Sequence, residues 1–418
     1  QQFASIRAAG LPASPEELDR WYAAVPEASN AAVVLAPAFE LLRTFPDKRS
    51  NDIAQAKLLD RREAWSAETR EQIAEYVAMN GEALAQARDG AKLPLCRYPI
   101  DLTYGLEAEL PHLAELKNLA RAAGLRAVSA AGKGSQADWS SDVRFILQLT
   151  TTLDHEPTLL SQLVRLSLIT TAVRTTERIL NSTTNSDPAY GLIEAFAAVV
   201  STNGIRLGLI GERACATPVF RMSWAEMDRG DKRAEDESSK TKLPPPAGRA
   251  NPLFWVLGFF ERDLSFYLNV METNIALAAI SPPANLAATN TTEQLSGTAS
   301  RRGYFYSGLM LPAIARATVR DATTLAQIRL VQTALAIECY RARYSQLPET
   351  LADLMPAFLV VVPADPFTGT PLRYRRTDEG FVIYSVDRDG HDNGGLEKPL
   401  NAKFSDPTNY DLTFTVER

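Results

Sequence analysis

The sequence holds few of the residues on which most catalytic and metal-binding sites depend. Its 418 residues include three histidines and three cysteines: His112, His155, His391, Cys96, Cys215 and Cys339. General acid–base catalysis and transition-metal binding rely heavily on His, so few His-based mechanisms can be built from this chain. The cysteines are far apart and have no CxxC or zinc-type spacing. We therefore expect three small buried side chains rather than a disulfide framework.

A basic excess and a long hydrophobic run are also missing. Lys and Arg number 44 and Asp and Glu 50, which gives a formal net charge of −6, so no positive field points to nucleic acid as a partner. The most apolar run, residues 252–260, is too short to span a bilayer and predicts a core helix. With 45% hydrophobic and 22% charged residues, the composition is typical of a folded globular protein.

The chain begins with Gln rather than Met. This start predicts that a leader was removed, either a signal peptide or an N-terminal membrane anchor. We therefore expect a periplasmic or envelope-anchored protein that touches a membrane only through such an anchor.

Residues 1–300 are predicted to form a mostly α-helical domain. Ser14, Pro15 and Glu17 make a capping box with Pro at the first helical position. Apolar periodicity and caps predict further helices over 30–42, from Ser66 onward, over 113–123 with Gly124 as terminator, and over 138–153, 157–180, 187–200 and 251–280. The short 154–156 connection predicts an antiparallel hairpin, and residues 228–248 and 281–300 are predicted loops.

Residues 308–418 are predicted to form a second domain. A long helix over 312–344 is followed, after Pro348, by a change of apolar period from 3.6 to two. This change predicts strands over 371–376, 381–386 and 411–416, the first two joined by a turn. The expected fold class is therefore α+β, with a large mostly α-helical domain followed by a long helix packed on a small antiparallel sheet.

Several segments of this C-terminal region occur in an order that resembles the major, G-type pseudopilin of type II secretion systems. They are the helix end at 336–341 with Tyr344-Ser345-Gln346-Leu347-Pro348, the short helix at 351–358, the segment Val362-Pro363-Ala364-Asp365-Pro366-Phe367, the loop from Tyr384 to Gly395, and the pair Asp411-Leu412. The resemblance covers less than a quarter of the chain and implies a calcium site that includes Asp389 and Asp411. The long helix departs from the family because it carries Arg316, Arg320, Asp321 and Arg329 where a pseudopilin has its membrane-spanning half. The first residues resemble the starts of uncharacterised bacterial envelope proteins.

The loop at 387–395 reads Asp-Arg-Asp-Gly-His-Asp-Asn-Gly-Gly. Carboxylates and carbonyls of this kind suit calcium, which takes six to eight oxygen ligands, although the spacing is not that of an EF-hand. An acidic Asx-turn loop without an ion is the alternative. The candidate metal ligands are Asp387, Asp389, Asp392, Asn393 and Asp411.

Two functions remain open on the sequence. The first is a non-enzymatic bacterial cell-envelope protein with a calcium-stabilised pseudopilin-like domain, which serves assembly or binding with other envelope or secretion proteins. The alternative is an envelope hydrolase whose carboxylate-based site lies in the helical domain. Its candidate residues are Asp142, Asp154, Glu156 and Glu194, because general acid–base work needs two such groups near one substrate. We favour the first, because no catalytic motif is complete in this sequence. Wherever part of such a motif occurs, other residues that the motif requires are missing.

Overall fold

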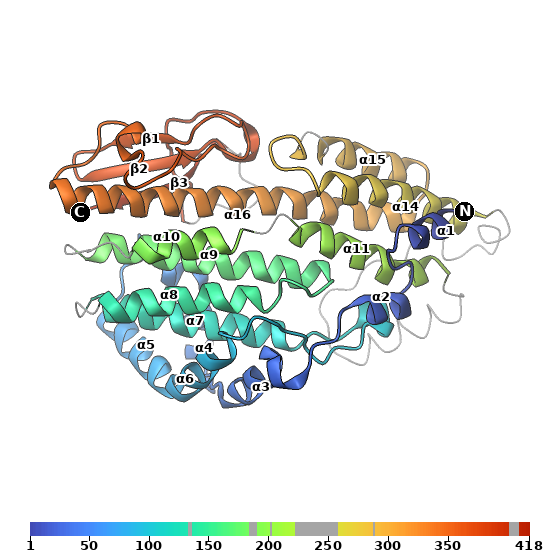
Figure 1. The fold of residues 1–418 in the computed structure, drawn as a ribbon, viewed down its shortest axis with the longest axis horizontal. Helices are drawn as coiled ribbons and strands as arrows, with labels where there is room; N and C mark the ends of the chain where they lie inside the picture. Colours follow the sequence, from blue (N-terminus) through green and yellow to red (C-terminus); the bar gives the residue numbers. More distant parts are fainter. Residues whose placement is uncertain (133–135, 184–189, 201–202, 222–257, 287–288, 401–408) are drawn as a thin grey trace.

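A computed structural model describes residues 1–132, 136–183, 190–200, 203–221, 258–286, 289–400 and 409–418. The molecule is mostly helical with one small antiparallel sheet, and its two termini lie at opposite ends of the long axis (Figure 1). This arrangement confirms the α+β class. The predicted loop at 228–248 and the apolar run at 252–257 lie outside the described residues.

The helices that precede the longest one are α1 (Gln2–Ala8), α2 (Pro15–Trp21), α3 (Ala31–Leu41), α4 (Arg49–Ala54), α5 (Ala67–Met79), α6 (Gly81–Gly90), α7 (His112–Ala131), α8 (Gln136–Thr151), α9 (Leu159–Ser182), α10 (Tyr190–Ala198), α11 (Gly204–Ala216), α14 (Phe259–Leu277) and α15 (Thr289–Arg301). Three of them begin where the sequence predicts a helix start. The side chains of Ser14, Asn30 and Ser66 each accept a hydrogen bond from a backbone amide in the first turn of α2, α3 and α5, which satisfies a donor that the helix itself leaves free.

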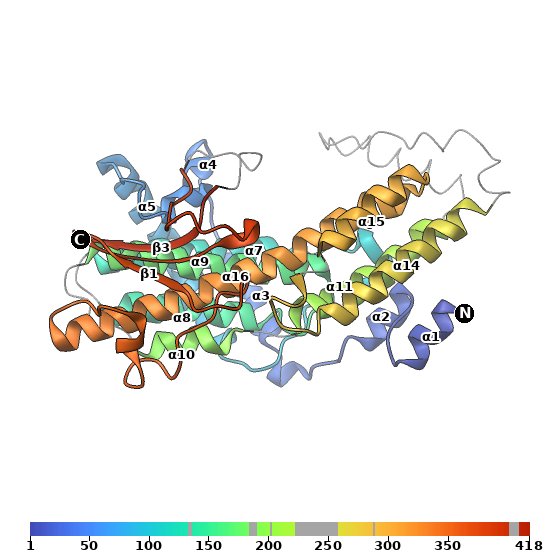
Figure 2. The same cartoon turned by 90° about the horizontal axis from the view of Figure 1, so that it is seen from above.

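The long helix α16 (Phe305–Tyr344) joins the two ends of the molecule, and the short 3-10 helix η7 (Leu351–Leu354) follows it. Strands β1 (Arg373–Arg376), β2 (Gly380–Ser385) and β3 (Leu412–Glu417) then form an antiparallel sheet in the order β1-β2-β3. The sheet covers the C-terminal half of α16, whose opposite side packs on α9 and α10 (Figures 1 and 2). The predicted period change after Pro348 and the turn between β1 and β2 are confirmed.

Two hydrophobic cores fill the molecule. The first core combines α7, α8 and α9 with the C-terminal half of α16 and the sheet, and includes Phe145, Ile169, Val331, Ile383 and Phe414. The second core combines α11 and α14 with the N-terminal half of α16, and includes Leu209, Tyr267, Met271, Leu311 and Ile314. Both cores draw residues from the two predicted domains, and the domain boundary between residues 300 and 308 stays a prediction.

Helix α9 also satisfies part of the outer edge of β3. The Glu177 carboxylate accepts a hydrogen bond from the Thr415 amide at 2.8 Å, and the Asn181 side chain donates to the Thr415 carbonyl at 2.7 Å. Such contacts protect an edge strand from pairing with another chain.

Two secondary-structure predictions are wrong, a helix end at Gly124 and a loop at 281–300. Gly124 does not end a helix, because α7 continues to Ala131; a Cβ at this glycine would lie 2.8 Å from the Thr175 Oγ1 of α9, so the glycine permits close packing of two helices. The predicted loop at 281–300 contains α15, whose buried face consists of small residues such as Thr292, Ser296 and Ala299. Such a face carries little of the apolar periodicity that reveals a helix.

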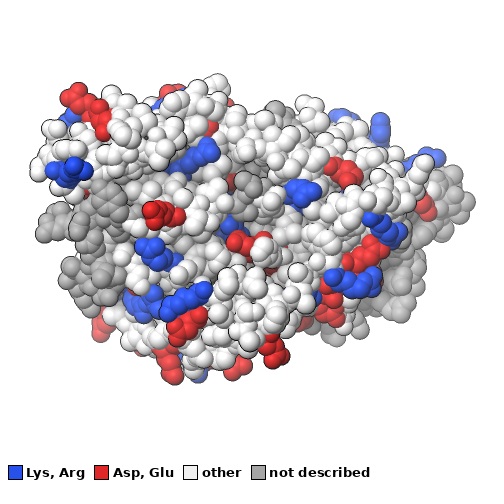
Figure 3. Space-filling model, viewed as in Figure 1, with Lys and Arg blue, Asp and Glu red and all other residues white. Residues whose placement is uncertain are grey.

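None of the described helices is both long and apolar enough to cross a membrane. Charged side chains of both signs are scattered over the face shown in Figure 3.

Candidate functional site

The acidic C-terminal loop is held by its own carboxylates. Asp389 accepts a hydrogen bond from the His391 amide at 3.0 Å, and Asp392 accepts from the Gly394 amide at 2.9 Å and from Arg373 Nε at 2.8 Å. The two bonds from the backbone amides are the local side-chain-to-backbone bonds of Asx turns, and the bond from Arg373 is an ion pair that ties the loop to β1. The loop is therefore held by its own backbone amides and by Arg373 of β1.

Asp411 anchors the loop from the first residue before β3. Its carboxylate accepts hydrogen bonds from the amides of Asn393, at 3.1 Å, and Gly395, at 2.7 Å. Burial raises the pKa of Asp411, and the nearby charges of Asp392 and Asp389 add to the rise. A concentration of negative charge of this kind favours a cation.

The predicted metal ligands are only partly brought together. Asp387 turns away from the others toward α16, where it accepts a hydrogen bond from Thr323 Oγ1 at 3.4 Å. In the part of the chain that the structure describes, no three His, Cys, Asp or Glu side chains are arranged to hold a metal ion. The oxygens around Asp389, Asp392 and Asp411 have the chemistry that calcium prefers, but a calcium site there needs backbone carbonyls or water as further ligands.

The four carboxylates of the alternative hypothesis do not meet at one site. Asp142 is buried and paired with Arg88 and Arg126, and Glu194 is exposed on α10. Paired or isolated in this way, these two carboxylates cannot act together on one substrate.

Glu156 lies in a closed polar cluster at the turn between α8 and α9. Its Oε1 is 2.9 Å from His112 Nε2 and accepts a hydrogen bond from Ser161, and the ring of Tyr98 stacks on His112 with centroids 4.0 Å apart. Glu156 and Ser161 are fully buried, and the serine donates to the carboxylate rather than to the histidine. The arrangement therefore ties α7 to the start of α9 and differs from a nucleophile–histidine–carboxylate relay.

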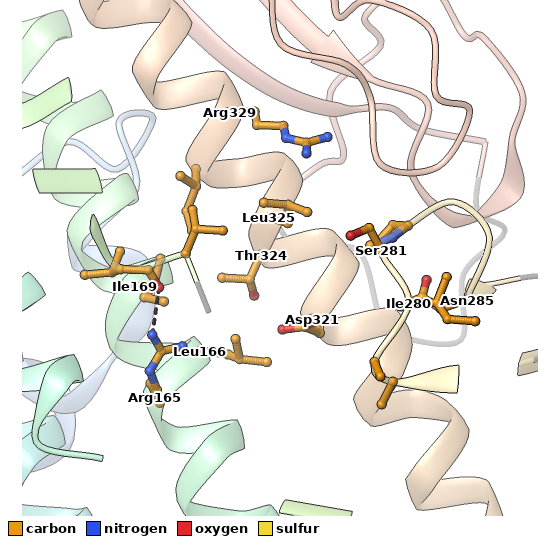
Figure 4. A pocket seen from close by; sticks show the side chains of 16 residues that line it. Arg165, Leu166, Ile169, Ile280, Ser281, Asn285, Asp321, Thr324, Leu325 and Arg329 are labelled. Carbon is orange, nitrogen blue, oxygen red and sulfur yellow. Dashed lines mark hydrogen bonds between the residues drawn. The ribbon is translucent and has the colours of Figure 1, made fainter. Parts of the chain in front are cut away.

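A cavity of about 130 Å³ lies where the two hydrophobic cores meet on α16. Helix α9 supplies Arg165, Leu166 and Ile169, helix α16 supplies residues from Asp321 to Arg329, and the segment 278–285 and the chain just after α10 complete the wall (Figure 4). Seams between packed units are common places for ligand sites.

Asp321 brings a carboxylate to this cavity from the middle of α16 (Figure 4). Burial raises the pKa of Asp321 to about 6, and the positive charge of Arg165 opposes the rise. A carboxyl group that titrates near neutrality at a cavity is a candidate functional group.

Arg165 is fixed beside Asp321 by two other partners. Its Nε donates to Asp154 at 2.6 Å and its Nη2 donates to the Val199 carbonyl at 2.7 Å. Asp154, one of the carboxylates that the sequence analysis named, thus acts on the cavity only through Arg165. From the sequence, Asp321 is recognisable only as a charge that sets α16 apart from a membrane-spanning helix.

Comparison of the chain with protein-family models, with curated proteins and with solved structures finds no match.

Proposed function

We propose that the chain is a non-enzymatic protein of the bacterial cell envelope, periplasmic or anchored there, in which α16 and the sheet form a pseudopilin-like unit that serves assembly or binding. The observation that carries the proposal is the order of elements after residue 305. A long helix, a short 3-10 helix and an antiparallel meander follow one another, which is the order that the resemblance implies.

Calcium stabilisation of the loop at 387–395 is part of this proposal. It is supported by the repulsion that the charges of Asp392 and Asp389 exert on the carboxylate of Asp411 and by the oxygen-only chemistry of the three side chains. A divalent cation would offset this repulsion, and it would stabilise the folded chain because it binds that form alone.

A binding role agrees better with the described cavity than hydrolysis does. Among its described lining residues, Asp321 is the single carboxylate, whereas hydrolysis by carboxylates uses a pair with separated pKa values. A surface feature also supports binding: Val360 and Val361, between η7 and β1, are 93% and 67% exposed. Large exposed apolar patches mark contact surfaces, and this pair of valines is a candidate part of such a patch.

In-cell crosslinking tests the proposal. A photo-crosslinking amino acid is placed at Val360 in the full-length gene, and the matched control places it at Asp378, which is exposed in the turn between β1 and β2. We expect the protein in the periplasmic or membrane fraction, with a discrete adduct from position 360 whose partner is itself an envelope protein by mass spectrometry. A cytosolic protein, or equal adducts from both positions, would contradict the proposal.

A further inference from the structure

The cavity between α9 and α16 presents hydrogen-bond acceptors that the described residues leave unused. Asn285 is 6% exposed, and its Oδ1 is buried without a hydrogen-bond partner. The carboxylate of Asp321 receives no hydrogen bond from the described residues, and its pKa responds only to burial and to the charge of Arg165. A buried acceptor without a partner costs about 1–3 kcal/mol, so Oδ1 of Asn285 favours a ligand that donates hydrogen bonds. The carboxylate of Asp321, which is half-buried, favours a ligand that carries positive charge.

The two cations of the lining are committed to other partners. Arg165 is paired with Asp154 and the Val199 carbonyl. Arg329 donates to the Ala364 carbonyl at 2.6 Å, and the charge of Asp365 acts on it. Asp321 therefore remains as the charged group of the described cavity lining that makes neither a hydrogen bond nor an ion pair with the described residues.

The remaining wall is mostly apolar. Leu166, Ile169, Leu325 and Ile328 face the cavity together with aliphatic residues of the segment 278–282. Ile280 is 47% exposed and lies at the rim, where a ligand can enter. A cavity of about 150 Å³ accommodates a benzene-sized molecule, which limits the ligand to about six non-hydrogen atoms.

We propose that this cavity binds a small organic cation, a primary ammonium group on a branched apolar body of four or five carbons. The ammonium donates to the carboxylate of Asp321 and to Oδ1 of Asn285, and the carbons pack on the aliphatic wall. Charge-assisted hydrogen bonds of this kind are the strong ones in proteins. The inference does not depend on the envelope role proposed above.

The cation requires the ionised form of Asp321, so binding depends on pH. The other ionisable groups of the lining, Arg165 and Arg329, stay charged through the neutral range. With a pKa of about 6 for Asp321, affinity is full at pH 8 and about tenfold weaker at pH 5. Bound cation in turn lowers the pKa of Asp321.

Ligand-observed NMR titration of the full chain tests the proposal with three probes of one shape. They are 3-methylbutylamine, its neutral isostere 3-methylbutanol and the anion 3-methylbutanoate. We expect the amine to bind with a dissociation constant on the order of 1 mM at pH 8, at least tenfold more tightly than the alcohol and more tightly still than the anion. Asp321→Asn should weaken the amine at least tenfold at pH 8, whereas Asp378→Asn should leave it unchanged.

A second variant, Asn285→Leu, keeps Asp321 and should weaken amine binding several-fold, which guards against a folding defect in the first. Far-UV circular dichroism establishes that both variants are folded. Equal binding of amine and alcohol, stronger binding of the anion, an amine affinity that ignores pH and Asp321→Asn, or no binding of any probe would each overturn the proposal.

Discussion

The most exacting prediction concerns Asp365, a fully buried carboxylate that connects the segment before β1 with the end of β2. It accepts hydrogen bonds from the Phe367 amide at 2.9 Å, from Ser385 Oγ at 2.8 Å and from the Val386 amide at 3.0 Å. Arg373 Nη1 lies 3.5 Å from it. Four donors thus converge on one carboxylate, and two of these hydrogen bonds, from Ser385 Oγ and from the Val386 amide, are buried.

Asp365→Ala removes all of these acceptors at once. Each buried donor left unpaired costs about 1–3 kcal/mol, and breaking a buried charged network typically costs about 3–5 kcal/mol. We therefore expect the free energy of opening of β2 to fall by about 3–5 kcal/mol. Asp365→Asn keeps one acceptor oxygen and should lose about half as much.

Hydrogen-exchange mass spectrometry of the full chain measures this change on peptides that cover 380–386. Asp378→Ala is the matched control, because Asp378 is exposed in the same sheet, and it should change protection by less than about 0.5 kcal/mol. If the amides of β2 are as well protected from exchange in Asp365→Ala as in the control variant, the carboxylate does not hold the sheet and the reasoning fails.

Three further predictions concern packing, buried charge and calcium. Gly211→Ala would place a Cβ against the backbone carbonyl of Pro157, just before α9, so it should destabilise the chain by about 1–3 kcal/mol or more in urea denaturation. Gly297→Ala, whose Cβ meets open space, is the control and should be neutral or slightly stabilising. Asp142→Ala leaves Arg88 and Arg126, whose side chains are 23% and 30% exposed, without their buried partner and should cost about 1–3 kcal/mol in the same assay; a loss below about 0.5 kcal/mol would show that the pairing is not structural. Calcium at a hundred times its dissociation constant should stabilise the chain by ~2.7 kcal/mol, a rise of about 3 °C in melting temperature for a chain of this length, and Asp389→Ala should abolish most of it; identical melting curves in calcium and chelator would leave the loop as an acidic turn.

The sequence predicts those parts of the fold that local chemistry controls. Ser14, Asn30 and Ser66 cap helices because a side-chain oxygen two or three residues before a free amide is a local arrangement. The strands of the sheet were found for the same reason, since their alternation and the turn between β1 and β2 are properties of adjacent residues.

Features that depend on distant neighbours could not be predicted. Gly124 is typical of a helix end until Thr175 of α9 is known to lie against it. Asp321 shows no motif, and its importance arises only because α9 and the segment 278–285 enclose it. The candidate metal ligands show both cases: Asp389 and Asp392 stay in their predicted loop, while Asp387 turns to Thr323 of α16.

The position of α16 near the end of the chain has a consequence for synthesis. Both cores need residues of α16, and the first core also needs β3, which ends at Glu417. Helices α7 to α9 are complete by Ser182. The apolar surfaces that they bury against α16 and β3 therefore stay uncovered until roughly 230 further residues are made, about 10–50 s at ordinary translation rates. During that interval the nascent chain exposes much of its future interior, and we expect it to depend on chaperones more than a protein whose domains close one after another.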